Sequence, residues 1–464
     1  MIIRFLPILI LLAAPLRAEN TNILPARTQD LEREKAVQTE ADKAAEEARK
    51  REVFVSTAGA DVTYEAVLAD PDNVNLNYRY ARAQVKKGNL RGAISTLERI
   101  LMIKPDATQA RLLYAIVLMR TGDLDEAERE FKTLQSKEVP YELRAELNSQ
   151  LRQIRRRTQK TRLSAMFGAG MDYNDNQNSA PASGQRLFGD VPITLDSAST
   201  RRGDFAKVML ANVGLAHDFA KGGHQLAGSV GYYRAEQSTQ KELNLQNYSA
   251  GLAGLVKTPW VDLSPSYDFN HLLLAQTTYL RSHTVGLRLS REFGRAAVFA
   301  ETAYADQRYN RTEVAPAGDQ RTGNMYQGGA GGSLVIGSRN RLTLSYSHVE
   351  QGAAELFDAY RRETVALEDA CILGLGQFLL FSVSGNFDRY LAPETAISAN
   401  YRHDQGLRAR ATYGLPLGFI ARPLDNAMLN FTYEYYQAFS NLTNYSYTNN
   451  KASTLLTYKW NVGL

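Results

Sequence analysis

The chain ends in the stretch STLLTYKWNVGL, residues 453–464. Every second residue counted back from the C-terminus is apolar or aromatic: Leu464, Val462, Trp460, Tyr458 and Leu456. The residues between them are mostly polar or small, so the segment has the period of two that is typical of a β-strand with one apolar face. Water-soluble domains usually end in polar, loosely held residues. A terminal strand of this kind favours a sheet that closes on itself in lipid, because lipid cannot hydrogen-bond an open strand edge.

The composition sets few other limits. The chain has 464 residues, 44% of them apolar and 22% charged, with a net charge of +5. These values suit a folded protein of two or three domains, and the charge excess is too small to indicate nucleic-acid binding. Cys371 is the single cysteine, so no internal disulfide is expected.

The N-terminal segment predicts export from the cytoplasm. Residues 1–18 combine a positive Arg4 with the apolar run Phe5–Pro15, which is too short to span a bilayer. We interpret this segment as a signal peptide cleaved near Ala18; a short membrane anchor is the alternative. Residues 19–60 are rich in Glu, Lys and Ala, which indicates a charged linker or solvated helix.

Residues 61–161 carry an internal repeat. Matching residues recur at an interval of 34: Gly88/Gly122, Ala81/Ala115, Ala93/Ala127, Tyr80/Tyr114, Leu90/Leu124 and Leu97/Phe131. This interval is typical of tetratricopeptide repeats, each a pair of short antiparallel helices. We predict two full repeats, preceded by one helix at 63–71 and followed by a capping helix after Pro140; coincidental helical pairs are the alternative.

Residues 162–464 have a period of two instead. Leu429, Phe431, Tyr433 and Tyr435, for example, alternate with polar residues. About 14 such segments have the length that a tilted strand needs to cross a bilayer. They start near residues 162, 205, 224, 243, 261, 281, 296, 324, 341, 360, 377, 399, 425 and 452. The predicted fold is therefore an α-helical tetratricopeptide-repeat solenoid followed by an antiparallel transmembrane β-barrel of about 14 strands; a soluble β-sandwich is the alternative for the second part.

The predicted connections between strands alternate in length. Short turns alternate with long connections at 174–203, 237–242, 275–280, 310–323, 351–359, 391–398 and 439–450, and the connection 416–424 breaks the rule by being long. Outer-membrane barrels have short periplasmic turns and long outer loops. We therefore expect an outer-membrane protein whose repeat domain and C-terminus lie in the periplasm.

The alternation also assigns side chains to the two faces of the wall. We expect five charged residues to face the barrel lumen: Arg288, Arg408, Arg410, Glu434 and Lys459. The apolar face of the last strand, Leu456 to Leu464, would face lipid and serve as the signal for the barrel-insertion machinery. A final Phe or Trp is usual in such signals, and Leu464 departs from that norm.

The sequence gives no catalytic or metal-binding set. The 6 histidines are scattered, and neither an HExxH nor a GxSxG motif is present. The run GGAGGS at 328–333 lacks the Lys-Ser/Thr of a phosphate loop, and its glycines suit a curved barrel wall instead. We expect no enzymatic activity, no cofactor and no metal site.

The arrangement of signal peptide, repeats and barrel resembles the surface lipoprotein assembly modifier family. Two local stretches add to the resemblance: GAGMDYNDNQNS at 168–179, in which Asn176 and Asn178 match a family segment, and SNLTNYSYTNN at 440–450. Members of that family move lipoproteins or related secreted proteins across the outer membrane. The resemblance implies that the repeats capture such a cargo in the periplasm and that the barrel passes it to the surface. The repeat region is shorter than is usual in the family.

In tetratricopeptide repeats the first helix of each pair lines the binding groove. By that resemblance the cargo-binding groove would consist of Asn75, Tyr78, Arg82, Val85, Lys86, Gln109, Leu112, Ile116, Met119 and Arg120. The expected partners are an exported lipoprotein or secreted protein, the insertion machinery and the lipid bilayer, and we expect a monomer that binds no nucleic acid. Three alternatives stay open: an exopolysaccharide exporter, which usually has more repeats and 16 strands, a porin or adhesin-like barrel, and an enzyme.

Overall fold

The computed structural model describes residues 63–463 apart from 138, 159, 198 and 220–222. The predicted signal peptide, the predicted linker and Leu464 lie outside the described residues. The described chain divides into a helical unit, which ends at Lys160, and a barrel, which begins at Thr161. Each unit is described by itself.

The helical unit consists of six helices in the part of the chain that is described: α3 (Tyr64–Ala69), α4 (Val74–Lys86), α5 (Leu90–Ile103), α6 (Thr108–Thr121), α7 (Leu124–Gln135) and α8 (Tyr141–Thr158). Asn73 and Asn89 cap α4 and α5 by accepting hydrogen bonds from the backbone N–H groups of Leu76 and Gly92. Gly122 ends α6 with a φ of 94°, which a glycine adopts without strain. Helices α4/α5 and α6/α7 are the two predicted repeats. None of the described helices is both long and apolar enough to cross a membrane.

The 34-residue spacing reflects how these helices pack. Residues at the repeated positions are fully buried in one apolar core: Ala81, Ala93, Ala115, Ala127, Leu97 and Phe131. The alanines allow the helices to approach closely, and Leu97 and Phe131 fill the space between them. The repeat is therefore a packing period rather than a coincidence of composition.

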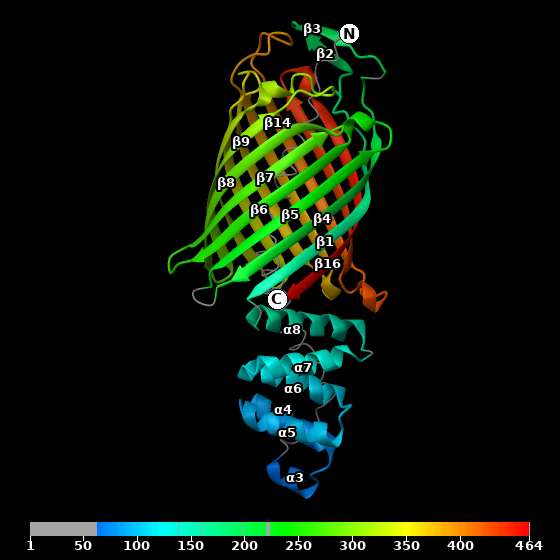
Figure 1. Ribbon diagram of the computed structural model, residues 1–464, viewed down its shortest axis with the longest axis vertical. Coiled ribbons are helices and arrows are strands. Elements are labelled where there is room, and N and C mark those ends of the chain that lie inside the picture. Colours follow the sequence, from blue (N-terminus) through cyan, green and yellow to red (C-terminus); the bar gives the residue numbers. More distant parts are fainter. Residues whose placement is uncertain (1–62, 138, 159, 198, 220–222, 464) are drawn as a thin grey trace. The chain divides into compact units, whose positions relative to one another are not determined.

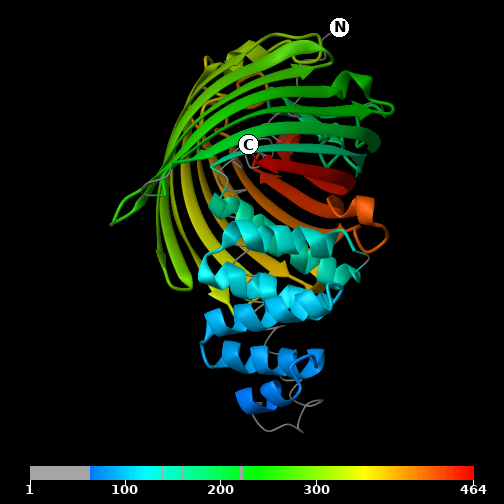
Figure 2. The same cartoon turned by 60° about the horizontal axis from the view of Figure 1, so that its bottom comes forward.

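Fourteen antiparallel strands form one closed barrel in which β1 pairs with β16 (Figure 1). The strands are β1 (Thr161–Asn174), β4 (Asp204–Asp218), β5 (Gln225–Gln237), β6 (Leu245–Lys257), β7 (Asp262–Leu274), β8 (Thr277–Phe293), β9 (Ala296–Tyr309), β10 (Gly323–Ile336), β11 (Asn340–Gln351), β12 (Tyr360–Ile372), β13 (Phe378–Tyr390), β14 (His403–Pro416), β15 (Ala427–Ser440) and β16 (Tyr447–Gly463). A separate hairpin, β2 (Gln185–Phe188) with β3 (Val191–Thr194), lies in the first loop. The predicted repeat-plus-barrel fold and its strand number are confirmed, and Figure 2 shows the strands of the wall wrapping around the barrel.

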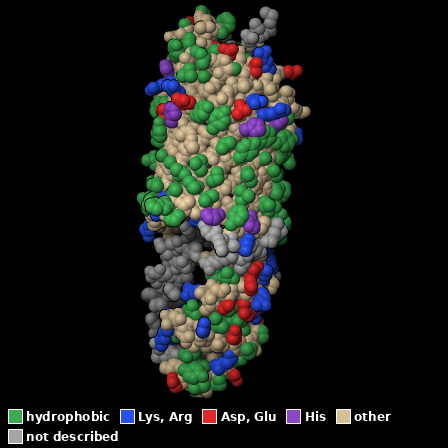
Figure 3. All heavy atoms as spheres, turned by 60° about the vertical axis from the view of Figure 1, so that its left-hand side comes forward, with side chains coloured by type: hydrophobic (Ala, Val, Ile, Leu, Met, Phe, Trp, Pro, Cys, Tyr) green, Lys and Arg blue, Asp and Glu red, His purple; other side chains and the backbone are tan. Residues whose placement is uncertain are grey.

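The outer face of the barrel is apolar. On β16, Tyr458 and Trp460 are 40% and 46% exposed, and Phe167, the register partner of Tyr458 on β1, is 55% exposed. Apolar side chains gather over the wall in Figure 3, and ionisable side chains gather at the margins of that band. A soluble sandwich would bury these residues, so this face identifies a transmembrane barrel of the outer-membrane type.

Long connections alternate with short ones, and we call the two ends of the barrel the loop end and the turn end. The loop end carries residues 175–203, 238–244, 310–322, 352–359, 391–402 and 441–446; the turn end carries short turns and the longer connection 417–426. The predicted long connection at 275–280 is wrong. Strands β7 and β8 meet there in a two-residue turn, in which Ala275 and Gln276 have φ values of 47° and 68°. Such hairpin turns are usually marked by glycine or asparagine, and neither residue is present here.

Candidate functional site

One part of the inner barrel wall carries paired charges. Glu434 of β15 lies between two arginines of β14: its carboxylate accepts hydrogen bonds from Arg408 Nη1 at 3.0 Å and from Arg410 Nη2 at 2.6 Å. The Glu434 side chain is only 12% exposed, so its charge depends on these two partners. These three residues face inward, because they alternate with Leu407 and Tyr433, which are exposed on the outer face.

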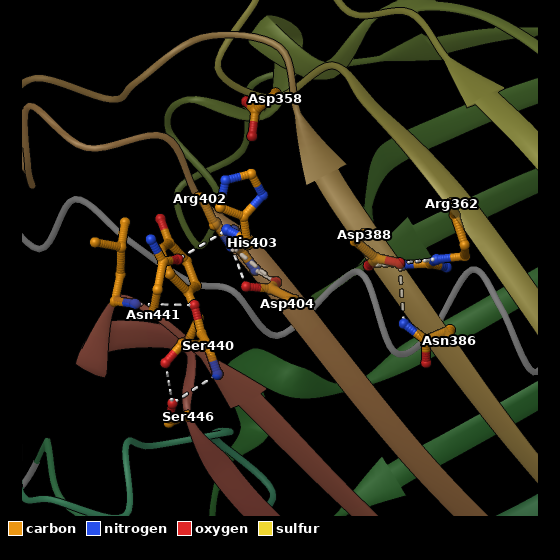
Figure 4. A network of polar contacts seen from close by, with 12 residues as sticks. Asp358, Arg362, Asn386, Asp388, Arg402, His403, Asp404, Ser440, Asn441 and Ser446 are labelled. Atoms are coloured by element: carbon orange, nitrogen blue, oxygen red, sulfur yellow. Dashed lines mark hydrogen bonds and ion pairs between the residues drawn. The ribbon is translucent and has the colours of Figure 1, made fainter.

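The charged surface continues on both sides of this cluster. On β16 and β1, Lys451 Nζ lies 2.7 Å from Asp172 Oδ2, so this ion pair crosses the seam at which the barrel closes. On β12 and β13, Arg362 donates two hydrogen bonds to Asp388, at 2.7 and 2.5 Å, and Asn386 donates a third to the same carboxylate (Figure 4). We call this surface on β12–β16 and β1 the charged wall. Each of the three carboxylates Asp172, Asp388 and Glu434 has a cation beside it.

The other part of the inner wall, on β5–β8, is lined by small residues. Ser229 pairs with Gly251, Gly231 with Ser249, and Ser266 with Gly286. These residues face inward because the positions between them, such as Val230 and Val285, are exposed on the outer face. The inside of the barrel is therefore asymmetric: ion pairs cover one wall, and serine–glycine pairs occupy part of another, which also carries Arg288 of β8.

Arg288 stands apart from the charged wall. It binds Glu301 of β9 at 3.1 Å, and its guanidinium lies 3.7 Å from the ring centroid of Phe299. The ring of Phe299 in turn occupies the space that a Cβ at Gly331 would need, which explains one glycine of the GGAGGS run.

Lys459 lies near the turn end rather than in the charged wall. Its backbone N–H donates to the carbonyl of Asn426, in the connection before β15, and its side chain is exposed. On the same strand Leu456 is 46% exposed, and Val462 is half-buried.

A polar clasp closes the seam between β1 and β16 at the loop end. Asp175 accepts two hydrogen bonds from Asn450, at 2.9 Å from its backbone N–H and 2.6 Å from its side-chain amide. Asn176 is 1% exposed, and its amide donates to the carbonyls of Thr448 and Ala180, both at 3.1 Å. Residues 168–179 and 440–450, the two stretches that resemble the family, are therefore joined by the hydrogen bonds of this clasp. The sequence indicated both stretches but not the contact between them.

The loops at this end are tied to one another. The carboxylate of Asp190, beside β3, accepts hydrogen bonds from the Ser398 hydroxyl and, at 3.0 Å, from the Ala399 N–H. These bonds hold the pKa of Asp190 below its usual range. A small apolar cluster joins the same loops, formed by Leu187, Ile397, Leu442 and Tyr445.

Arg402 anchors one of these loops to the barrel rim. Its guanidinium lies 3.2 Å from the ring centroid of Tyr445 and 4.3 Å from that of Tyr390, and it binds Asp404 at 2.5 Å (Figure 4). The Tyr445 hydroxyl donates to Glu394 at 3.0 Å. Burial raises the pKa of Glu394 to about 7, so this loop carboxyl titrates near neutral pH.

The predicted groove residues lie on α4 and α6. Asn75, Lys86, Gln109 and Arg120 are exposed, and Arg82 is half-buried. The apolar members are half-buried and pack against the helical core: Tyr78, Val85, Leu112, Ile116 and Met119. The exposed polar members are therefore the ones available for binding. Lys86 and Arg120 occupy equivalent positions, because each lies in the last turn of the first helix of its repeat.

No cluster of three or more potential metal ligands occurs among the described residues. His348 accompanies Glu363 on the outer face of the wall, with 2.6 Å between Nδ1 and Oε1, whereas Ser345 and Ser347 face inward. These residues therefore cannot act together as a nucleophile and its base.

Comparison with known proteins identifies the repeats. The tetratricopeptide-repeat family model matches residues 57–109 and 85–147. DnaJ homolog subfamily C member 3 from mouse and from human is 35% identical over 88 residues, which are 19% of this chain and 18% of each relative. The chain thus matches less than a fifth of the length of these curated relatives.

Several solved structures are also similar. OpdO of Pseudomonas aeruginosa covers 65% of this chain and 97% of its own, with 10% identity and a TM-score of 0.33. OccAB3 of Acinetobacter baumannii covers 65% and 99%, with 7% identity and a TM-score of 0.36. The P58(IPK) TPR domain covers 21% and 28%, with 34% identity and a TM-score of 0.20.

Proposed function

We propose that this chain is an outer-membrane translocator for a lipoprotein or a related secreted protein. The repeat unit captures the cargo in the periplasm through α4 and α6, and the barrel passes it to the cell surface. The observation that carries this proposal is the joining, in one chain, of tetratricopeptide repeats to a closed barrel whose inner wall is polar. Repeats of this type present an extended surface suited to another polypeptide.

The inner wall supports a polypeptide as the passenger. Because Asp172, Asp388 and Glu434 are each paired with Arg or Lys, a passing segment meets compensated charge at these positions of the wall. The small residues of β5–β8 leave more space beside their wall than long side chains would. Both features suit a passenger of mixed sequence, and in this proposal the protein is a transporter rather than an enzyme.

The exopolysaccharide exporter is less well supported. That class usually has 16 strands and many more repeats, whereas this barrel has fourteen strands and the described helices form two full repeats. In the translocator proposal the protein acts as a monomer, and the barrel-insertion machinery recognises its C-terminal strand.

A surface-exposure assay tests the proposal. Intact cells with and without this protein are treated with an external protease, and the lipoproteins that are cleaved are identified by mass spectrometry. At least one lipoprotein should lose surface exposure in cells without the protein, while its total amount stays the same. A periplasmic marker must stay protected in both strains. Identical cleaved sets would contradict the proposal.

A further inference from the structure

Two rows of basic side chains cross the outer face of the barrel near the loop end. Each row contains two neighbouring arginines and a histidine: His271, Arg281 and Arg308 on β7–β9, and Arg361, Arg389 and His403 on β12–β14. In each row the three residues are direct register partners on adjacent strands. They face outward, because they alternate with the inward-facing positions of their strands.

The arginines of a row stand directly opposite each other, an arrangement that destabilises a sheet unless a negative charge compensates it. In the β12–β14 row the protein supplies that charge: Glu350 binds Arg361 at 3.2 Å, and the charge of Glu363 lies close to Arg389. In the β7–β9 row Asp306 binds Arg308 at 3.2 Å. Arg281 forms no ion pair with any residue that the structure describes.

The position of the β7–β9 row along the barrel wall indicates which negative group compensates the charge of its arginines. Four residues along β8 from Arg281 lies Val285, which is 56% exposed, and its register partners Tyr267 and Tyr304 are 41% and 39% exposed. At about 3.3 Å per residue, the arginines lie ~13 Å along the tilted strands from this apolar and aromatic level. Because barrel strands tilt by about 40°, this is ~10 Å along the membrane normal, which takes the arginines from the edge of the hydrocarbon region to the level of the lipid headgroups.

We propose that Arg281 and Arg308 bind the phosphate of an anionic lipid headgroup in the leaflet on the loop side of the membrane, with His271 beside them. Two adjacent guanidinium groups offer several N–H donors to one phosphate, and guanidinium–phosphate pairs are among the strongest hydrogen-bonded pairs in proteins. The acyl chains of the same lipid would lie against Tyr267, Val285 and Tyr304. The site depends on the barrel lying in a membrane and is independent of the cargo.

The β12–β14 row is a matched control: it has the same residue types at the loop end, but each of its two arginines has a carboxylate nearby, whereas in the β7–β9 row only Arg308 does. The full chain, purified in a neutral detergent, is mixed with micelles that contain phosphatidic acid or phosphatidylcholine, and the bound lipid is measured after gel filtration. Arg281→Gln with Arg308→Gln should weaken phosphatidic-acid binding about 25-fold, or about fivefold for each arginine. Arg361→Gln with Arg389→Gln should weaken it by less than about threefold.

Equal loss in the two double variants, or wild-type binding by Arg281→Gln/Arg308→Gln, would overturn the site. Equal binding of phosphatidylcholine would overturn the phosphate assignment. Displacement of the lipid by millimolar inorganic phosphate would show that a free anion satisfies the arginines, which would overturn the lipid assignment. Heat-modifiable migration in gels verifies that each barrel is folded. If the double variant does not fold, Arg281→Gln alone gives the decisive measurement, with an expected loss of about fivefold.

Discussion

A lysine at position 456 tests whether the last strand faces lipid as the structure has it. Leu456 lies near the middle of β16, is 46% exposed on the outer face and pairs with Ala169 of β1 and Leu429 of β15. A lysine on the lipid face of a barrel at mid-membrane costs about 2–4 kcal/mol. Because 1.4 kcal/mol corresponds to a factor of ten, Leu456→Lys should lower the folded-to-unfolded ratio by roughly 30- to 700-fold.

Ser453→Lys is the matched control on the same strand. Ser453 faces inward, and its register partner on β1 is Asp172, so a lysine there avoids lipid and shares with Lys451 the carboxylate of Asp172. We expect this variant to lose less than about 1 kcal/mol. Urea unfolding in lipid vesicles, followed by heat-modifiable migration in gels, measures both variants. Equal losses, or a larger loss for Ser453→Lys, would refute the assignment of the two faces.

Three further predictions follow from the loop end and the repeats. In a background without Cys371, a cysteine at the exposed Ser183 should react with an impermeant thiol reagent on whole cells, and one at the exposed Ser136 of the repeat unit should not; the reverse pattern would invert the topology. Asn176→Ala removes side-chain hydrogen bonds to Ala180 and Thr448 in a buried site, so it should destabilise the barrel by about 2–3 kcal/mol in urea unfolding. A loss below about 0.5 kcal/mol would show that the clasp does not stabilise the barrel. Burial raises the pKa of Glu394 to about 7. The protonated Glu394 side chain should therefore stabilise the closed loops fully when the pH is below the ordinary pKa of a glutamate, and this stabilisation should be lost as the pH rises through about 7. Hydrogen exchange of residues 391–402 should therefore quicken between pH 6 and pH 8 in the wild type but not in Glu394→Gln, after correction for intrinsic rates; parallel profiles would contradict this.

The sequence predicted those features that depend on local periodicity. Alternation along single strands predicted the fourteen-stranded barrel and the inward direction of Arg408, Arg410 and Glu434, because successive side chains in a strand point to opposite faces. The 34-residue interval predicted the helical repeats, because one packing arrangement recurs with that period.

Features that depend on distant partners could not be predicted in this way. The clasp joins Asn176 to Thr448 across 272 residues, and no local pattern reports such a contact. The neighbours Arg281 and Arg308 likewise face each other only through the register between β8 and β9, which the pattern of either strand alone does not specify. The two-residue turn at Ala275 and Gln276 was missed because neither residue is a usual turn former.

The central claim is that the repeats hold the cargo that the barrel exports, and one pair of variants tests it most directly. Lys86→Glu with Arg120→Glu reverses the two exposed basic side chains at equivalent positions of α4 and α6 and leaves the helical core intact. Arg91→Glu with Lys132→Glu makes the same charge change on α5 and α7 and is the control. With the barrel folded in both variants, the amount of surface-exposed cargo should fall at least tenfold in Lys86→Glu/Arg120→Glu and stay near the wild-type level in Arg91→Glu/Lys132→Glu. A tenfold effect corresponds to about 1.4 kcal/mol of binding free energy. Wild-type export by the Lys86→Glu/Arg120→Glu variant would contradict the account.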